Sequence, residues 1–260
     1  MPDSPSSIPV TAPSGTWKGL TQRKIWRQPM EHSPRVFDRF LGRFFLSIFH
    51  SWLIDVRGLE YISSARDPFI VALNHNQRLE SLLIPILMIH RRHGRLIHFL
   101  ADWNFFLIPF IGSYYRRSGS IIVTRKQARP RILNRLKPFF EQPLPAMTRA
   151  LHKLQEGASV GVFPEGTINR DPKTLLRGSP SAARLSIESG APIVPVGVRF
   201  PGHNPEEPIG DLEKMVVEIG PPMTPPFFTD GKRASAGDVR EWHAELMRTL
   251  ARLSGKNWPP

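Results

Sequence analysis

The chain has 260 residues, and 40% of them are hydrophobic, which is typical of one globular domain with a sizeable core. It contains no cysteine, which excludes disulfides, thiolate metal sites and a cysteine nucleophile. Its formal net charge of +13 favours a polyanionic partner, whether nucleic acid, an anionic membrane surface or a phosphorylated substrate.

The N-terminal segment, residues 1–33, predicts a disordered basic arm, because it is rich in Pro, Ser, Lys and Arg and poor in core-forming residues. Its first fifteen residues lack the apolar centre of a signal peptide. No apolar run in the sequence reaches the ~18 residues that a membrane-spanning helix needs.

Residues 34–54 predict an amphipathic helix. At 100° per residue, Arg35, Arg39 and Arg43 lie on one side, and a row of Phe, Leu and Ile lies on the other. Bulky apolar groups beside an arginine row suit a helix that lies in a bilayer interface. The alternative is a helix that packs on its own domain, and the pattern does not choose between them.

Strand-like and helix-like patterns alternate along residues 55–260, which predicts a single α/β domain. We expect a central mixed, largely parallel sheet flanked by helices, with functional loops at the carboxyl ends of the strands. The expected strands are 67–74, 120–124, 158–163, 193–198 and 214–219. The expected helices are about 79–91, 145–156, 180–189 and 238–253.

A histidine and a carboxylate follow the first of these strands. His75 falls in the loop after it, and Glu80 falls in the first turn of the next helix. There a carboxylate can accept from one ring nitrogen and leave the other free as a general base. The alternative is a polar loop residue beside an acid that faces the helix dipole.

Two further strand ends carry polar groups. The segment 163–167 (Phe-Pro-Glu-Gly-Thr) follows a buried strand, and Gly166 permits a tight turn with close approach of a ligand. Arg170, Lys173 and Arg177 come next and form a candidate phosphate clamp. Arg125 ends the strand that begins after Gly119. Taken singly, each segment also reads as an ordinary strand exit with solvated charges.

Taken together and in this order, the segments resemble the PlsC-type glycerolipid acyltransferase family. That family has the patterns N-H-x4-D, G-x-I-x-x-x-R, F-P-E-G-T and a V-P-I-V-P-V-like strand. The matching segments are Asn74–Glu80, Gly119–Arg125, Phe163–Thr167 and Ala191–Val196, and the resemblance covers roughly residues 55–220. Two positions depart from it: Glu80 replaces the aspartate, and Ile168 stands where many relatives have arginine.

The resemblance implies the glycerol-3-phosphate acyltransferase-like fold and a reaction in a ternary complex without an acyl-enzyme. His75 would be the general base and Glu80 its orienting carboxylate. The donor would be acyl-CoA or acyl-carrier protein, with no cofactor and no metal. The residues that would bind substrate are Gly119, Arg125, Glu165, Gly166, Thr167, Arg170 and Arg177.

The implied acceptor is a lysophospholipid such as lysophosphatidic acid, in phospholipid biosynthesis. Ile168 keeps a second acceptor class open, an ornithine lipid or a glycolipid. A third possibility is a non-enzymatic basic relative that binds membranes. We expect the enzyme at the cytoplasmic face of a membrane, peripheral or monotopic, on an anionic surface. We expect no nucleic-acid partner, because the basic segment 125–137 lacks a recognisable reading motif.

Overall fold

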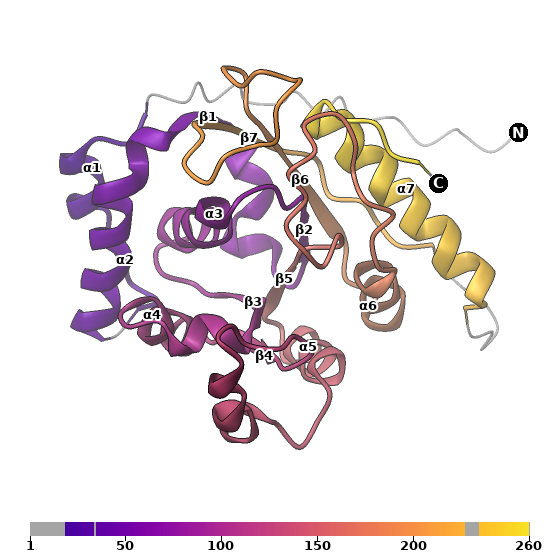
Figure 1. The fold of residues 1–260 in the computed structure, drawn as a ribbon, viewed down its shortest axis with the longest axis horizontal. Helices are drawn as coiled ribbons and strands as arrows, with labels where there is room; N and C mark the ends of the chain where they lie inside the picture. The colour runs from indigo at the N-terminus through magenta and orange to yellow at the C-terminus, as the bar shows by residue number, and fades with distance from the viewer. Residues whose placement is uncertain (1–18, 34, 227–233, 260) are drawn as a thin grey trace, which may run out of the picture.

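A seven-stranded sheet runs through the computed structural model, in the order β1-β7-β6-β2-β5-β3-β4 (Figure 1). The structure describes residues 19–33, 35–226 and 234–259. Every neighbouring pair is parallel except β6 and β7, which run antiparallel. The strands in chain order are β1 Leu53–Arg57, β2 Ile70–Leu73, β3 Ile97–Asp102, β4 Ile121–Val123, β5 Ser159–Val162, β6 Ile193–Arg199 and β7 Met215–Ile219. The predicted α/β class with a mixed, largely parallel sheet is therefore confirmed.

Helices cover both faces of the sheet and form two separate cores. One core contains side chains of α2 (Val36–Phe49), α3 (Arg78–Arg91) and α4 (Ile111–Arg117). The other contains side chains of α5 (Ala146–Gln155), α6 (Ser181–Ser189) and α7 (Ala236–Ser254). Alternate residues of β2 enter each core, Val71 and Leu73 the first, Ile70 and Ala72 the second. This two-sided burial explains why the central strands are continuously apolar.

Part of the predicted disordered arm is folded, which corrects that expectation. Residues 22–27 form the helix α1 (Gln22–Arg27), and Ile25 within it is fully buried. The Ile25 carbonyl is 3.0 Å from His90 Nε2, and Arg43 donates to the Gln28 carbonyl at 2.8 Å. A few apolar anchors and distant hydrogen bonds thus hold a polar segment that composition alone marks as disordered. Residues 1–18 lie outside the described residues.

The predicted helix of residues 34–54 is shorter than expected. α2 ends at Phe49, a 3₁₀ turn follows over His50–Trp52, and the edge strand β1 begins at Leu53. Parallel pairing of β1 with β7 overrides the local helical pattern from Leu53 onward, with an irregularity in the register between Leu53 and Asp55. Strands β1 and β3 and the helix α4 were not anticipated at all.

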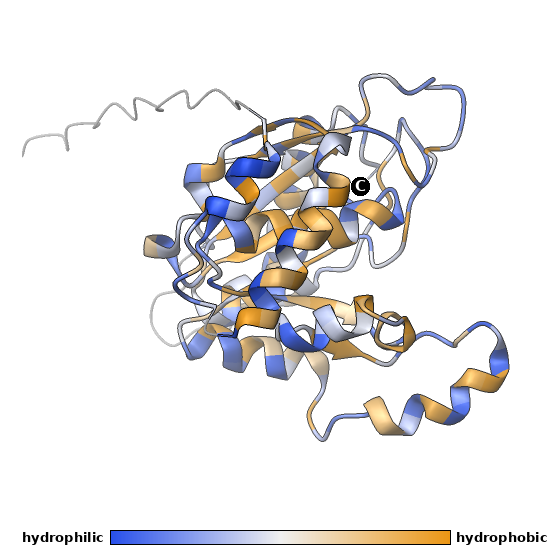
Figure 2. Cartoon of the chain, turned by 90° about the vertical axis from the view of Figure 1, so that its left-hand side faces the viewer, coloured by the Kyte–Doolittle hydropathy of each residue, from blue (hydrophilic) through white to orange (hydrophobic). Residues whose placement is uncertain are grey.

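α2 packs on its own domain, as one of the two expected arrangements has it, and it also leaves apolar side chains exposed. Leu41, Phe45 and Leu46 are buried against the domain. The adjoining face of the helix, which lies on the side of the molecule that Figure 2 views, leaves a row of apolar side chains between 42% and 47% exposed: Phe37, Phe40, Phe44 and Ile48. No helix among the described residues is long and apolar enough to cross a bilayer.

Candidate active site

The loop after β2 is fixed by a buried asparagine. Asn74 is fully buried, and its side chain pairs with the backbone of Val198 in β6. Its Oδ1 accepts from the Val198 N–H at 2.8 Å, and its Nδ2 donates to the Val198 carbonyl at 3.1 Å. An amide side chain supplies both a donor and an acceptor, so it substitutes for a strand neighbour at this point. Asn74 thereby determines where His75 leaves the sheet.

His75 and Glu80 form the pair that the sequence predicts. α3 begins at Arg78, so His75 lies in the loop and Glu80 in the first turn. His75 Nδ1 lies 2.9 Å from Glu80 Oε1, and the backbone N–H of Asn76 donates to the same oxygen. A carboxylate that only accepts places the proton on Nδ1, so Nε2 has a free lone pair. No hydrogen bond to a described residue engages Nε2, and the side chain lines a cavity.

Both carboxylate oxygens of Glu80 are engaged. Glu80 is fully buried, and its second oxygen accepts from Asn76 Nδ2 at 3.1 Å. The additional methylene lets one carboxylate reach the imidazole and both N–H groups of Asn76. The group that orients His75 is therefore itself fixed by two donors from the next residue, a preorganised arrangement for a general base.

Glu165, which the sequence predicts to bind substrate, lies next to His75, and both of its carboxylate oxygens accept hydrogen bonds from the protein. Oε1 accepts from the His75 backbone N–H at 3.0 Å. Oε2 accepts from the Leu176 N–H at 2.9 Å and from Asn169 Nδ2 at 2.8 Å. The carboxylate is buried and joins the His75 loop to the loop after β5. Its position is that of a residue that holds the base in place.

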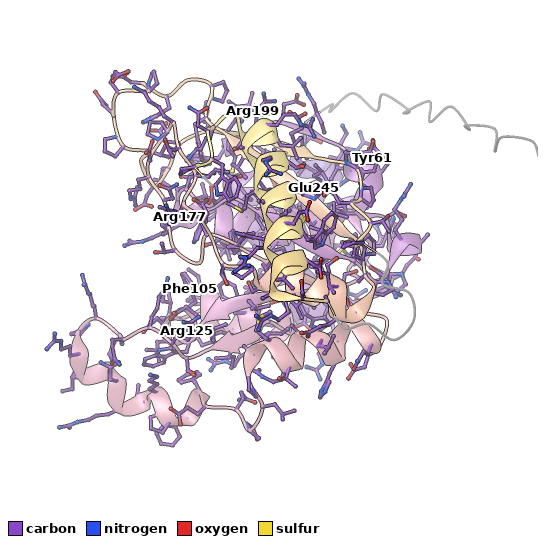
Figure 3. The ribbon with its side chains drawn as sticks, turned by 90° about the vertical axis from the view of Figure 1, so that its right-hand side faces the viewer. Tyr61, Phe105, Arg125, Arg177, Arg199 and Glu245 are labelled. Atoms are coloured by element: carbon purple, nitrogen blue, oxygen red, sulfur yellow. The ribbon has the colours of Figure 1, made fainter. Side chains whose placement is uncertain are left out.

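His75 opens onto a cavity of about 810 Å³ between β3, β4 and the start of α5. The Phe163 ring packs 4.5 Å from the His75 ring, and Gly166 (φ +68°) makes the turn beside them. Arg125 reaches the cavity from the end of β4, on the same side as Phe105 in Figure 3. The other apolar side chains that line it include Phe99, Leu100, Phe105, Tyr115, Ile122, Phe140, Leu144 and Met147.

The predicted phosphate clamp after β5 is not assembled around this cavity. Arg170 is ion-paired with Asp211 at 2.7 Å, and Lys173 is paired with Glu206 at 2.6 Å. Arg177 is exposed and does not line the cavity. The loop that bears them turns toward residues 204–213, whose acids the sequence pattern could not place nearby. The cations that do line the cavity are Arg125, Lys126, Arg149 and Arg184.

The two remaining predicted residues also lie outside the cavity lining. Thr167 is exposed on the turn after Gly166. Gly119 has φ +65°, and a Cβ there would lie 2.7 Å from the His98 ring, so the position needs glycine for packing. Within residues 19–33, 35–226 and 234–259, no group of three or more His, Asp or Glu side chains could hold a metal ion.

A lysine from the other end of the chain completes the site, and sequence reasoning missed it. Lys256 follows α7, and its Nζ donates to Asn76 Oδ1 and to the Asp171 carbonyl. Burial lowers the pKa of Lys256, and the charges of Glu165, Glu80 and Asp171 oppose that shift. The contact between Lys256 and Asn76 spans 180 residues, so no local pattern reveals it.

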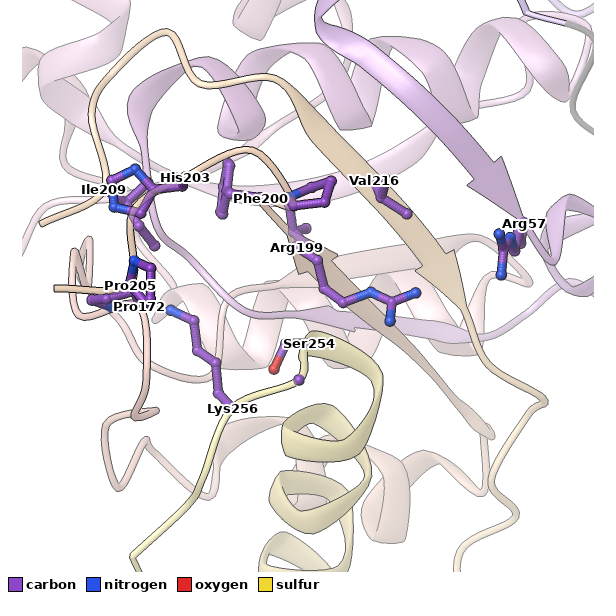
Figure 4. A pocket seen from close by; sticks show the side chains of 13 residues that line it. Arg57, Pro172, Arg199, Phe200, His203, Pro205, Ile209, Val216, Ser254 and Lys256 are labelled. Carbon is purple, nitrogen blue, oxygen red and sulfur yellow. The ribbon is translucent and has the colours of Figure 1, made fainter. Parts of the chain in front are cut away.

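Residues after Lys256 attach the C-terminal segment to the loop after β5. Asn257 N–H donates to the Lys173 carbonyl, and Leu175 N–H donates to the Asn257 carbonyl, each at 2.8 Å. In Figure 4, Lys256 extends from the end of α7 toward Pro172 and Pro205, beside a second cavity of about 490 Å³. His75 does not line that second cavity.

This geometry defines a class of enzyme. An imidazole held by a buried carboxylate, open to a largely apolar cavity with cations at its edge, can activate a hydroxyl of an amphiphilic substrate. The Acyltransferase family model matches residues 53–199, more than half of the chain. The chain therefore belongs to the acyltransferase family, and its resemblance to the PlsC-type members is confirmed.

Individual relatives are distant. The chain is 26% identical over 164 residues to a chloroplastic 1-acyl-sn-glycerol-3-phosphate acyltransferase of Brassica napus, covering 62% of this chain and 42% of the relative. It is 26% identical over 156 residues to the 1-acyl-sn-glycerol-3-phosphate acyltransferase of Bacillus subtilis, covering 60% of this chain and 66% of the relative. The crystal structure of PlsC from Thermotoga maritima shares the fold, with a TM-score of 0.56 and 22% identity over 86% of this chain and 81% of that one.

The orienting role of Glu80 predicts a graded response to substitution. Glu80→Gln keeps the shape but removes the charge that stabilises a protonated His75, so kcat should fall by about 10²-fold or more with little change in KM. Glu80→Asp retains the charge and should keep activity within roughly tenfold. Steady-state kinetics of both variants check this. Wild-type kcat in Glu80→Gln would contradict the role.

The buried position of Lys256 predicts a loss of both stability and activity in Lys256→Met. The substitution removes two hydrogen bonds and leaves buried carboxylates without a nearby cation, at a cost of about 2–4 kcal/mol of unfolding free energy. The control is Lys173→Met, which breaks an exposed ion pair and should cost under about 1 kcal/mol. Urea unfolding and acyl-transfer assays measure both. Equal losses in the two variants would refute a special role for Lys256.

Proposed function

We propose that the protein transfers a fatty acyl chain from a thioester to a hydroxyl of a lysophospholipid such as lysophosphatidic acid, in phospholipid biosynthesis. The observation that carries the proposal is the free Nε2 side of the His75–Glu80 pair on an apolar cavity. At about 810 Å³, that cavity lies within the range of small-molecule sites, roughly 300–1,000 Å³. The chain spans about two fifths of the length of the plant relatives that it matches.

The chemistry follows from the position of the imidazole. His75 Nε2 accepts the proton of the acceptor hydroxyl while its oxygen attacks the thioester carbonyl carbon. The tetrahedral oxyanion then collapses, the C–S bond breaks, and the imidazolium returns its proton to the leaving thiolate. Glu80 stabilises the imidazolium between these two steps. No covalent acyl-enzyme forms, which agrees with the absence of cysteine from the sequence.

Free cations at the cavity edge support a phosphorylated acceptor. Neither Arg125 nor Lys126 forms an ion pair with a described acid, so their charges are available to a ligand. An arginine guanidinium suits phosphate because it donates two parallel hydrogen bonds. The relatives named above are 1-acyl-sn-glycerol-3-phosphate acyltransferases. The donor would be acyl-CoA or acyl-carrier protein, and no cofactor is required.

A non-phosphate acceptor is the second candidate, and two observations favour it. Ile168 stands where a relative's arginine would follow the Phe-Pro-Glu-Gly-Thr segment. Arg170, the next cation along the chain, is neutralised by Asp211. An ornithine lipid or a glycolipid would then use the same base and the same apolar cavity, with Arg125 contributing less.

A membrane surface is the proposed location of the enzyme. The exposed apolar row of α2 and the net charge of +13 both favour peripheral binding to an anionic bilayer, of the kind found at the cytoplasmic face. Such a position gives the cavity direct access to lipid acceptors.

The reaction class is tested with a panel of acceptors and one inactive variant. Purified protein in liposomes receives labelled acyl-CoA, or acyl-carrier protein, with glycerol 3-phosphate, lysophosphatidic acid, lysophosphatidylcholine or lyso-ornithine lipid. We expect product from lysophosphatidic acid, and a loss of about 10³-fold or more in His75→Ala. Product from lyso-ornithine lipid alone would select the second candidate. Transfer that persists in His75→Ala would refute the mechanism.

The proposed phosphate contact predicts a selective effect of Arg125→Gln. KM for lysophosphatidic acid should rise by roughly tenfold, because one charge-assisted hydrogen-bonding partner is lost. KM for an uncharged acceptor should stay constant. Arg177→Gln is the matched control, since Arg177 is equally cationic but does not line the cavity. Similar kinetics for the two variants would assign the phosphate contact elsewhere.

A further inference from the structure

The segment between β4 and α5 stands away from the body of the protein. It contains the 3₁₀-helical stretch η5 (Arg131–Phe140), in which no residue is buried. Figure 2 shows this stretch projecting at the lower right, with alternating hydrophilic and hydrophobic residues. Such an excursion costs conformational entropy and buries little apolar surface, so the fold alone does not account for it.

Specific contacts hold the base of this projection in place. Trp103 is fully buried, and its Nε1 donates to the Lys126 carbonyl at 2.9 Å. The same indole packs 5.6 Å from the Phe140 ring at the other end. Asn134 braces the middle, because its Oδ1 accepts from the Ala128 N–H at 2.8 Å and its Nδ2 donates to the Arg131 carbonyl at 2.8 Å. One tryptophan thus holds both ends of a preformed projection.

Large apolar side chains lie exposed along the length of η5. Phe139 is 82% exposed, Ile132 is 65% exposed and Leu136 is 40% exposed. A single exposed apolar residue is ordinary, but three within eight positions of one projecting element form a surface that water solvates poorly. This surface favours an apolar environment.

The charges of residues 125–140 are all of one sign, and Glu141 is the first acid after them. Six Lys or Arg residues lie between positions 125 and 137, and no Asp or Glu occurs from 125 to 140. None of the six forms an ion pair with an acid that the structure describes. Arg170 and Lys173, in contrast, are paired with Asp211 and Glu206. The positive charge of these six residues therefore favours an anionic partner.

We propose that η5 is a docking element for an anionic lipid bilayer. Its cations contact lipid phosphates while Ile132, Leu136 and Phe139 enter the acyl boundary. Lys126 and Phe140 at its base also line the His75 cavity, so docking places the cavity opening at the membrane. Nucleic acid is disfavoured because two of the three protruding groups are aliphatic and cannot stack on bases. η5 is a different element from the exposed row of α2. The docking proposal rests on the proposed function only for the identity of the lipid that enters the cavity.

Vesicle co-sedimentation without substrate tests the proposal. The probes are vesicles of phosphatidylcholine mixed with phosphatidylglycerol, and vesicles of phosphatidylcholine alone. Phe139→Glu should weaken binding to the mixed vesicles by about tenfold or more, because it puts an anion where an apolar ring enters the bilayer. Arg131→Ser/Arg135→Ser/Lys137→Ser should weaken it by a similar factor or more, and added salt should reduce the difference.

Matched controls carry the same chemical changes elsewhere on the surface. Leu212→Glu changes a side chain that is 62% exposed, and Arg240→Ser/Arg248→Ser/Arg252→Ser removes three exposed cations from α7. Both should bind mixed vesicles within roughly twofold of wild type. The proposal is overturned if Phe139→Glu binds like wild type, or if the controls lose as much as the η5 variants. Loss of self-association or of RNA binding, with unchanged vesicle binding, would also overturn it.

Activity separates this proposal from the proposed function. Acyl transfer between water-soluble, short-chain substrates should be unchanged in Phe139→Glu, while transfer to an acceptor embedded in mixed vesicles should fall about tenfold. Equal loss with both kinds of substrate would show damage to the fold and would overturn the docking role. If no acceptor is acylated but the vesicle results hold, the proposed function fails and the docking element stands.

Discussion

The hydrogen-bonding needs of two buried carboxylates next to the loop after β2 constrain the rest of the fold. Glu80 and Glu165 both lie beside His75, and like charges at close range in a poor solvent are costly unless donors surround them. The donors come from the loop backbone, from Asn76 and Asn169, and from Lys256 at a further step. These groups come from three parts of the chain: the loop after β2, the loop after β5 and the C-terminal segment. Satisfying the two acids therefore fixes the relative positions of the loops after β2 and β5 and of the C-terminal segment.

Patterns that are local in the sequence predict the centre of the site, and contacts between distant segments do not. The spacing of His75 and Glu80, with a strand before and a helix after, is enough to place both correctly. The role of Lys256 depends on where α7 ends against the sheet. The cations of the expected clamp do not line the cavity, and Arg170 is paired with Asp211, which comes from a loop whose path no local pattern predicts. The helical prediction extends to Leu53 and Ile54 because these two residues are apolar in a helix and in a strand alike, and only the pairing of β1 with β7 decides between them.

The ion pairs also show where on the molecule the positive charge is left without an acidic partner. Some cations are fixed to acids and serve the fold, as Arg92 does with the buried Asp67. Those of the segment 125–137 have no such partner among the described acids, and two of them, Arg125 and Lys126, line the cavity. Composition alone states that the chain is basic, whereas the structure separates cations that are paired with acids from cations that are not. The second group lies near Phe139, whose ring is the most exposed aromatic side chain among the described residues.

The two sides of the cavity are consequently built by different means. On the His75 side, a parallel sheet buried on both faces and a network of satisfied acids hold one imidazole in one orientation. On the η5 side, a projection held at its base by Trp103 presents apolar groups and cations outward. Proton transfer requires positions fixed to a fraction of an ångström. Contact with a fluid bilayer requires only the right sequence of apolar and basic groups, so a projection with little core of its own is sufficient there.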